Sequence, residues 1–506
     1  MNISGSEYSD PVESSILFDV LPLNRDGDYL VFVGVDGGGT GTDCLVRIVD
    51  AEKHAAGVVN LDDAETGVVV TTHCRTGAAN ANSVGFEQAL ANVSSAIFLA
   101  VDCALYAALR DKSEDDYDTD DVEPLVSHAW VGNQDTESLF ERGTCEHERE
   151  FLVITKGGKR KRPRWCGYRY RFRLAGVALG IAGCDSPAGQ KRWRDVLLTP
   201  PRKVPRGCAF APETLVVEND AVIALARATR GTARGGALLV AGTGTVAFAV
   251  SHAGTRARTM GFGPAFDDPG SGHWLGTKAL ALTAKALDRC YRDRWAYGED
   301  GVIEAFDAPA AQRVTRAVLM KLGFAVHDLF ESEKVRDARR EDLTRWAYEG
   351  GPAPAWDRVA SLAPILLRES EHDDCSMVAG IVRDGANALA ENLVVAIDRA
   401  RDGESVRDEK TPFVISLVGG LFNGKTRRYA EEVKRRTTAL LRRRFEGERL
   451  KDERYVFYED RASRTCGDIG GPMAGAVAMA AEAFEEFEER RGRNPNLAPV
   501  SAVSRT

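Results

Sequence analysis

Two segments of the chain share one pattern, in which a long apolar run meets a glycine-rich turn and a second apolar run follows. The first is YLVFVGVDGGGTGTDCLVRIVD, residues 29–50, and the second is ALLVAGTGTVAFAV, residues 237–250. Continuous apolar runs rich in β-branched residues predict buried strands. A short glycine turn between two such runs predicts a hairpin. We therefore expect two α/β lobes, each opening with a hairpin.

Helical periodicity and further apolar runs fill in the two lobes. Residues 86–110 carry apolar side chains at helical spacing and predict a long amphipathic helix that packs on the first sheet. The runs LAGVALGIAG (174–183) and TLVVEND (214–220) predict further strands. After the second hairpin, the pattern predicts helices at 272–290, 312–331 and 376–400, the buried strand PFVISLVGG, a helix from Lys425, and a last helix rich in small residues, GPMAGAVAMAAEAFEEFEERR.

The chain has 506 residues, which is too long for one hydrophobic core and fits two domains with insertions. We expect a disordered leader at 1–27, an N-terminal domain at 28–225 with an insertion at about 111–173, and a C-terminal domain at 226–482. The last helix is expected to pack back on the first lobe, and residues 483–506 to form a charged tail. Apolar residues make up 44% of the chain, an ordinary globular composition that excludes fibrous or wholly disordered classes.

Charge and cysteine usage narrow the class of protein. The net charge of −9 disfavours the whole chain as a binder of polyanions. Ten cysteines are scattered without a CxxC pair, so neither a zinc site nor a disulfide framework is indicated. The polar N-terminus has no signal-peptide pattern, and we noted no apolar run of the ~20 residues that span a bilayer. We expect a soluble cytoplasmic protein without a membrane role.

The insertion combines an acidic run, DKSEDDYDTDDVE (111–123), with a basic run, residues 156–173. The basic run holds nine Lys or Arg interleaved with aromatic residues, a composition that nucleic-acid or membrane-surface binders also use. Its KRKRPR portion also fits a nuclear address. We favour an exposed strand with Arg outward and aromatics inward, paired electrostatically with the acidic run, and expect no nucleic acid as the main partner.

The glycine turns carry the first candidate chemistry. At the first turn, a strand delivers Asp36 to its end, and the glycines that follow let backbone N–H groups approach an anion closely. A carboxylate beside a phosphate loop can hold Mg²⁺, directly or through water. A plain tight hairpin is the alternative. The second turn, AGTGT (241–245), repeats the arrangement, so the two turns together favour a duplicated fold whose turns clamp a triphosphate from both sides.

Three further motifs supply polar groups. VVEND ends a strand with Asp220, a candidate general base that would accept a proton from a sugar hydroxyl. The alternative role for Asp220 is N-capping of the next helix. FDDPGSGHW (266–274) offers acids that bind paired hydroxyl groups, and TGAANANSVG (76–85) offers amide side chains.

Taken in order, VGVDGGGT, GAANANSVG, LGIAGCD, VVENDAVIA, VAGTGT, GFGPAFDDPGSGHWLG, VGGLF and PMAGAVAMA resemble the N-acetylglucosamine kinase family, which includes the BadF-type ATPases, within the hexokinase and actin-like ATPase superfamily. The resemblance spans about residues 30–482 without the insertion. It implies an α/β fold of two ribonuclease-H-like domains with ATP in the interdomain cleft, and a homodimer. It also implies transfer of the γ-phosphoryl group of Mg-ATP to the 6-hydroxyl of N-acetylglucosamine or a close amino sugar.

By position, the resemblance assigns a role to each matching residue. Asp220 is the catalytic base, and Asp36 holds Mg²⁺. The ATP ligands are Gly37, Gly38, Gly39, Thr40, Gly242, Thr243, Gly419 and Gly420. The sugar ligands are Asn80, Gly244, Thr245, Phe262 and Asp268. Pro269 departs from the glutamate that is usual after the position of Asp268, which leaves the sugar open among N-acetylglucosamine, glucosamine, N-acetylmannosamine and muramic-type sugars.

Two other functions stay open at this stage. GGLFNGKT (419–426) matches the P-loop pattern GxxxxGK[ST] between a strand and a helix, although only eighty residues remain for the rest of such a domain. BadF-type activators instead couple ATP hydrolysis to electron transfer through a cysteine-held iron–sulfur cluster. No cysteine lies beside either glycine turn in a cluster-like pattern, so we favour the kinase.

Overall fold

The computed structural model forms two compact units, residues 1–233 with 460–506, and residues 234–459. The structure describes residues 13–16, 27–38, 41–57, 68–109, 139, 144–155, 162–198, 211–229, 231–266, 268–288, 308–349, 356–372, 377–402, 412–422, 427–444, 455–458, 471–495 and 497–499. Our expected boundary at 225/226 is wrong, because it falls inside α6 (Asp220–Ala228). Residues 460–482, which we assigned to the second domain apart from its returning helix, belong to the first unit.

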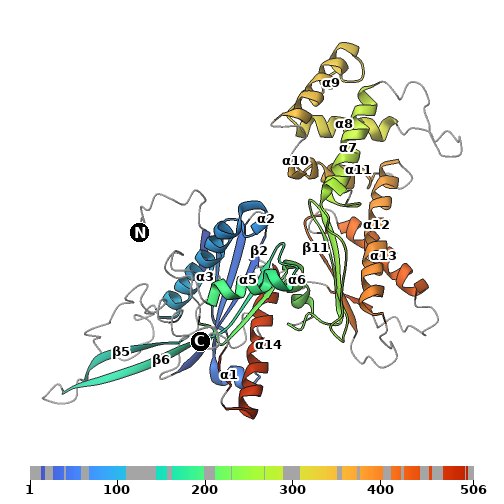
Figure 1. Ribbon diagram of the computed structural model, residues 1–506. Helices are drawn as coiled ribbons and strands as arrows, with labels where there is room; N and C mark the ends of the chain where they lie inside the picture. Colours follow the sequence, from blue (N-terminus) through green and yellow to red (C-terminus); the bar gives the residue numbers. More distant parts are fainter. Residues whose placement is uncertain are drawn as a thin grey trace. The chain divides into compact units, whose positions relative to one another are not determined.

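The first unit is built on a seven-stranded mixed sheet (Figure 1). Its strands are β1 (Glu13–Ile16), β2 (Asp28–Gly37), β3 (Thr42–Asp50), β4 (Val68–Thr76), β5 (Thr144–Thr155), β6 (Arg162–Ile181) and β7 (Thr214–Glu218). The central order is β4-β3-β2-β6-β7. β3 is antiparallel to both of its neighbours, β4 and β2, whereas β2, β6 and β7 run parallel. Their carboxyl ends therefore meet at one edge of the sheet.

Helices cover both faces of this sheet. The long helix α3 (Phe86–Leu109), predicted from its periodicity, packs on β3 and β4. The last helix, α14 (Gly471–Arg493), packs on β2, β6, β7 and α6. Shorter helices are α1 (Ala51–Ala55), α2 (Ala81–Val84) and α5 (Pro187–Leu198).

The composition of α3 corrects one of our expectations. Within the described residues, α3 is the one helix long and apolar enough to cross a membrane, although we noted no such stretch in the sequence. Length and composition are weak evidence, since a core helix passes the same test. Here Val93, Ile97 and Leu105 are fully buried in the core of the first unit.

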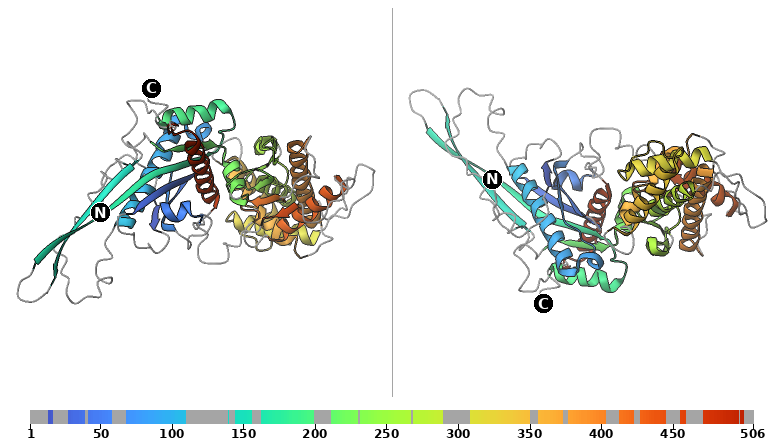
Figure 2. Two further views of the ribbon diagram at one scale, coloured as in Figure 1. Left: turned by 90° about the horizontal axis from the view of Figure 1, so that it is seen from below. Right: turned by 90° about the horizontal axis from the view of Figure 1, so that it is seen from above.

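The basic run and the next strand form one element. We expected a strand at 174–183, but β6 is continuous from Arg162 to Ile181 and pairs along its first half with β5. The two strands extend together beyond the rest of the sheet (Figure 2). The strand register sets Glu146 opposite Arg171 and Glu148 opposite Arg169. The acidic run at 111–123 lies outside the described residues.

The second unit repeats the central topology of the first. Its strands are β8 (Gly236–Ala241), β9 (Thr245–Val250), β10 (Arg256–Met260), β11 (Phe413–Val418) and β12 (Tyr455–Phe457). They lie in the order β10-β9-β8-β11-β12, with an antiparallel β8–β9–β10 meander and parallel β8, β11 and β12. Both units thus show the strand order of the ribonuclease-H-like fold, and the predicted fold class is confirmed.

Helices dominate the rest of the second unit. They are the short 3-10 helix η1 (Pro264–Phe266), α7 (Gly272–Leu287), α8 (Ala308–Lys321), α9 (Glu333–Tyr348), α10 (Trp356–Ala360), α11 (Ala363–Glu369), α12 (Met377–Ala400) and α13 (Arg427–Arg444). The expected helices at 272–290 and 376–400 correspond to α7 and α12. The expected helix at 312–331 is wrong at its end, since α8 stops at Lys321. Helices α9, α10 and α11 were not predicted.

Candidate active site

Two acidic residues of the first unit lie at the carboxyl-end edge of its parallel strands. Asp36 is the next-to-last residue of β2, and Asp220 begins α6 directly after β7. Both are half-buried. Burial first, and then the charges of Asp220 and Asp43, raise the pKa of Asp36 to about 7, whereas Arg75 acts to lower it. A bound cation would offset the repulsion between the two carboxylates that this shift reflects.

The N-cap residue of α6 is Asn219, which directly precedes Asp220. The side-chain oxygen of Asn219 accepts from the Ala221 N–H at 2.8 Å. Asp220 follows as the first helical residue, where the positive end of the helix dipole favours a carboxylate. The alternative that Asp220 is the N-cap residue is therefore wrong, although its Oδ1 also accepts from Ala221 at 2.9 Å.

The first glycine turn is fastened to the segment that carries Asn80. The Gly38 carbonyl accepts from the backbone N–H groups of Ala79 and Asn80 at 3.0 and 3.2 Å, and the Gly38 N–H donates to Gly41 at 2.9 Å. A β-carbon at Gly37 would lie 2.8 Å from Ala79 Cβ, so the close approach requires glycine there. The structure thus brings Gly37, Gly38 and Asn80 together. Gly39 and Thr40 lie outside the described residues.

The second glycine turn joins β8 to β9 and is fixed by Asp268. The Gly242 N–H donates to the Gly244 carbonyl at 3.0 Å, and Thr243 is exposed. Asp268 is only 4% exposed, and its Oδ2 accepts from the Thr245 N–H at 3.1 Å. A β-carbon at Gly244 would lie 2.6 Å from that same oxygen. Asp268 therefore shapes the turn, a role that the sequence motif did not suggest.

The start of α7 also docks on the second turn. The N–H groups of Gly272 and His273 donate to the carbonyls of Gly242 and Thr243 at 2.7 and 3.1 Å. Burial lowers the pKa of His273, against an opposing effect of Asp268. Ser271 caps the helix by accepting from the Trp274 N–H. The start of α7 thus also supports the second glycine turn.

The Gly419–Gly420 turn follows β11 and lies against the end of β8. Gly419 has a φ of +115°, and a β-carbon there would overlap the carbonyl group of Ala241. The Leu421 N–H donates to the same Ala241 carbonyl at 3.2 Å. Since Ala241 directly precedes Gly242, the structure brings the Gly419–Gly420 turn beside the second glycine turn. Gly420 is exposed, with open space where a side chain would project.

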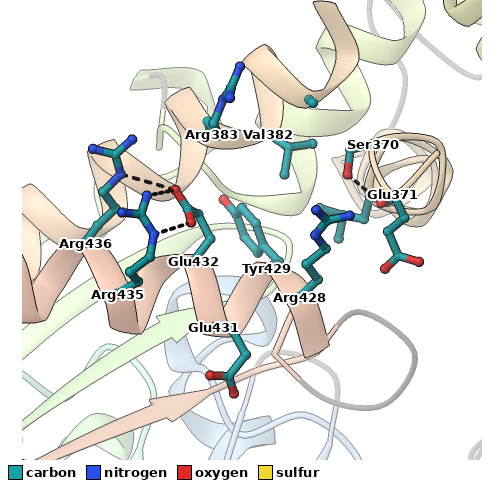
Figure 3. A pocket seen from close by; sticks show the side chains of 12 residues that line it. Ser370, Glu371, Val382, Arg383, Arg428, Tyr429, Glu431, Glu432, Arg435 and Arg436 are labelled. Carbon is teal, nitrogen blue, oxygen red and sulfur yellow. Dashed lines mark hydrogen bonds and ion pairs between the residues drawn. The ribbon is translucent and has the colours of Figure 1, made fainter. Parts of the chain in front are cut away.

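A cavity of about 390 Å³ opens between α11, α12 and α13 (Figure 3). Its lining combines apolar side chains with arginines and glutamates, and Glu432 binds Arg435 through both oxygens at 2.8 and 2.6 Å. Tyr429 lines the cavity and stacks on Phe422, the residue that closes the Gly419 turn. The Tyr429 hydroxyl donates to the Gly270 carbonyl at 2.9 Å. The cavity is thus connected by direct contacts to the Gly419 turn and to the segment that carries Asp268.

Phe262, expected beside the sugar, lies on the surface of the second unit with 79% of its area exposed. Phe266 (76%) and Trp356 (51%) are exposed as well. A β-carbon at Gly263 would lie 3.8 Å from the Trp356 ring, so Trp356 approaches the same turn. Phe262, Phe266 and Trp356 thus all lie near the turn at Gly263.

The family profile of the BadF/BadG/BcrA/BcrD ATPases matches residues 33–438. The chain belongs to this family. The family named from the motifs is therefore confirmed.

Curated relatives of this BadF-type chain include two sugar kinases. An N-acetyl-D-glucosamine kinase of Dictyostelium discoideum is 28% identical over 205 residues, 40% of this chain and 52% of the relative. An N-acetylmuramic acid/N-acetylglucosamine kinase of Clostridium acetobutylicum is 30% identical over 255 residues, 50% of this chain and 67% of the relative. The chain thus spans about half the length of the first relative and two thirds of the second.

Among solved structures, a candidate N-acetylglucosamine kinase from Chromobacterium violaceum aligns over 89% of this chain and 98% of its own, with a TM-score of 0.43 and 17% identity. A hexokinase aligns over 93% of this chain and 88% of its own, with a TM-score of 0.33 and 13% identity. Structural similarity of this degree carries no weight, so the fold assignment rests on the strand order of the two sheets.

The structure does not favour a P-loop at residues 419–426. Its described part, Gly419–Phe422, is a tight turn closed by the Phe422 N–H donating to Gly419 at 3.0 Å. β11 belongs to a sheet in which β8, β9 and β10 are antiparallel, whereas a P-loop domain rests on parallel strands. Residues 423–426 lie outside the described residues.

The motifs did not single out Asp43, His73, Arg75 or Tyr429. Asp43 Oδ1 contacts His73 Nε2 at 2.9 Å, and Asp43 Oδ2 contacts Arg75 Nη1 at 3.4 Å. A signal was present in the sequence, since His73 and Arg75 are charged or ionisable residues at alternate positions of a strand that begins with three valines. Tyr429 had no such signal, because its partner Gly270 is distant in sequence.

Proposed function

We propose that the chain transfers the γ-phosphoryl group of ATP to the 6-hydroxyl of an amino sugar, with N-acetyl-D-glucosamine as substrate and N-acetyl-D-glucosamine 6-phosphate as product. The observation that carries the proposal is the placement of Asp36 and Asp220 at one sheet edge beside the Gly37–Gly38 turn. Phosphoryl transfer needs a carboxylate for the metal, a carboxylate for the nucleophile and donors for phosphate. The kinase names of both curated relatives support the same reaction class.

Asp36 is the proposed Mg²⁺ ligand, directly or through water. Mg²⁺ prefers oxygen ligands and is commonly held by one or two carboxylates together with substrate phosphates. The donor set fits, since the charge of Asp220 is one cause of the raised pKa of Asp36, and a bound cation would offset the repulsion between the two carboxylates. When bound, Mg²⁺ neutralises charge that develops on the phosphates. Asp36 keeps the ion at the end of β2.

Asp220 is the proposed general base. Its place in the first turn of α6 favours the ionised carboxylate, which is the form that accepts a proton from the sugar hydroxyl. By accepting that proton, Asp220 both orients and activates a poor nucleophile.

The second unit supplies further proposed nucleotide ligands, in addition to the first glycine turn. Backbone N–H groups of the Gly242–Gly244 turn bind phosphate, and the exposed Gly420 borders the adenosine. The adenine ring of the nucleotide then occupies the cavity between α11, α12 and α13, whose volume of about 390 Å³ falls in the range of small-molecule sites.

Sugar recognition is assigned to Asn80, Asp268, Gly244, Thr245 and Phe262. The Asp268 carboxylate uses Oδ2 for the Thr245 N–H, and within the described residues Oδ1 makes no hydrogen bond. We assign Oδ1 to a sugar hydroxyl. Pro269 stands where a glutamate is usual and so removes a carboxylate from this site. We assign the choice among amino sugars to this difference.

A coupled ADP-release assay tests the proposal. Mg-ATP is supplied with N-acetylglucosamine, glucosamine, N-acetylmannosamine or N-acetylmuramic acid, and a reaction without sugar is the control. ADP release that depends on N-acetylglucosamine, with a phosphorylated product identified by mass, is the expected result. Release at the same rate without sugar would overturn the kinase in favour of an ATPase of the activator type, and release with N-acetylmuramic acid alone would change the substrate.

A further inference from the structure

Three charged residues form a row across the first sheet at its glycine-turn end. The register pairs Asp36 of β2 with Asp43 of β3, and Asp43 with Arg75 of β4. Directly opposed residues of antiparallel strands project from the same face. The side chain of Arg75 therefore lies on the face of the sheet that carries Asp36, two strands away from it.

One edge of the Arg75 guanidinium group is held and the other is directed toward the glycine turn. Nη1 contacts the Asp43 carboxylate at 3.4 Å, and Asp43 is itself held by His73 at 2.9 Å. A β-carbon at Gly41 would lie 2.9 Å from Nη2 and 3.1 Å from Nε of Arg75. Among the described residues, neither Nε nor Nη2 makes a hydrogen bond. The Arg75 side chain as a whole is 48% exposed.

The Nε–Nη2 edge is suited to an anion with two oxygens. Two parallel N–H groups of a guanidinium match carboxylate and phosphate geometry, and such paired bonds are stronger than neutral hydrogen bonds. The surroundings contain acids at Asp36, Asp43 and Asp220, and Arg75 is the cation that lowers the pKa of Asp36. A polyphosphate entering this acidic site requires a positive partner of this kind.

We propose that Arg75 binds the β- and γ-phosphate groups of the nucleotide beside the first glycine turn through its Nε–Nη2 edge. Asp43, fixed by His73, sets the direction of that edge, and glycine at position 41 leaves it open. The inference rests on the proposed function and adds a phosphate ligand that the glycine motif does not contain.

The test measures equilibrium binding of ATP, ADP and AMP by isothermal titration calorimetry. Arg75→Gln removes the charge. Gly41→Ala keeps the charge but displaces the guanidinium group, and the displacement costs little because the atoms in the way end a flexible side chain. Arg490→Gln is the matched control, since Arg490 is an exposed arginine of the same unit paired with one carboxylate, that of Glu486, at 3.2 Å.

We expect Arg75→Gln to weaken ATP binding by about ten- to hundredfold, as for loss of a charged hydrogen-bond pair, with AMP binding unchanged. The affinity for ADP should fall by a smaller factor than the affinity for ATP, because ADP keeps only one of the two phosphate groups that Arg75 would bind. Gly41→Ala should weaken ATP binding in the same direction by a smaller factor, and Arg490→Gln should have no effect. Thermal melting of each variant establishes that it is folded.

Two outcomes separate this inference from the kinase proposal. If Arg75→Gln binds ATP as tightly as the wild type, or loses AMP and ATP binding equally, the role of Arg75 is overturned whatever the enzyme phosphorylates. If ATP binding falls selectively while no sugar is phosphorylated by the wild type, Arg75 keeps its role and the sugar kinase proposal fails.

Discussion

At the residue scale, the raised pKa of Asp36 predicts how the stability of the protein depends on pH. Its pKa is about 7 in the folded chain, against 3.8 for an ordinary aspartate. A carboxyl group whose pKa is raised by folding stabilises the protein below its unfolded pKa and loses that contribution as pH rises toward the folded pKa. The wild type should therefore lose stability between about pH 4 and pH 7 at this site, by up to about 1.4 kcal/mol for each pH unit.

Asp36→Asn removes this dependence, because an amide does not titrate. We expect urea unfolding at pH 5 and pH 7.5 to show that the stability of the variant relative to the wild type is greater at the higher pH, by about 1 to 2 kcal/mol after allowance for the partial exposure of Asp36. Asp195→Asn, at an exposed acid paired with Lys191, is the control and should gain nothing. An Asp36→Asn advantage of the same size at both pH values would contradict the cause given for the shift.

Asp220 makes a separate prediction about catalysis. Asp220→Asn keeps the size of the side chain and removes the proton acceptor, so kcat should fall by at least about a hundredfold, within the contribution of general bases. The affinity for ATP should stay nearly unchanged, because the proposed nucleotide ligands are other residues. Steady-state kinetics and calorimetry measure the two quantities. A kcat within about tenfold of the wild type would remove Asp220 as the base.

The sequence indicated which acidic residues lie at the candidate site, but not the contacts that surround them. The motifs indicated Asp36 and Asp220 because each acid ends an apolar strand, which is a local pattern. The tie between Asp268 and the Thr245 N–H, and the row from Asp36 to Arg75, depend on strand register and on residues distant in sequence. Neither can be obtained from local spacing.

At the element scale, the small residues of α14 account for how closely this helix lies to its neighbours. A β-carbon at Gly34 in β2 would lie 2.5 Å from the Met473 carbonyl oxygen, and one at Gly176 in β6 would lie 2.5 Å from that of Ala480. These contacts are with backbone, which cannot move without shifting the whole helix. Glycine at these two strand positions thus allows α14 to pack closely on the first sheet.

Gly475 and Gly492 provide a matched pair of substitutions within α14. A β-carbon at Gly475 would overlap the Ile223 carbonyl of α6, whereas one at Gly492 meets nothing within 4 Å. Gly475→Ala should destabilise the first unit by about 1 to 3 kcal/mol, the usual cost of overpacking. Gly492→Ala should be neutral or stabilise by up to about 1 kcal/mol, since alanine favours the helix. Chemical denaturation measures both, and equal effects would contradict the close packing of α14.

Some elements were predictable and others were not, for physical reasons. Both glycine hairpins and helices α3 and α12 carry strong local periodicity, and all were predicted. In α9 only Arg336 and Trp346 are buried, so its sequence has little apolar stripe to detect. The first half of β6 was expected as a separate exposed strand. Its continuity with the strand that follows, and its pairing with β5, were not predicted, because β5 lies in the segment that we took for an insertion.

At the scale of the whole molecule, the first unit is discontinuous in sequence. Residues 1–233 supply its sheet, and residues 460–506 supply α14. The helix contributes Ala476, Val477, Ala480 and Phe484 to a buried cluster with Leu30, Phe32 and Leu45. The second unit, residues 234–459, is continuous and has a core of its own.

This difference predicts how the two units behave when expressed separately. Residues 234–459 should fold alone and unfold cooperatively, because their core needs no residue from outside the segment. Residues 1–233 should fail to fold, because removal of α14 exposes the apolar face of β2, β3 and β6 to water. Circular dichroism with thermal melting, and dispersion of amide signals in NMR, distinguish the two results.

A fusion makes the prediction specific to α14. Joining residues 460–506 to residue 233 through a flexible linker should restore a folded first unit, while the same fusion with Phe484→Asp should not, because a charge would enter the buried cluster. Phe484 packs its ring against Phe32 at 5.8 Å between centroids, so the substitution acts at the contact between helix and sheet. A cooperative, dispersed fold for residues 1–233 alone would show that α14 is an accessory to this sheet and not part of its core.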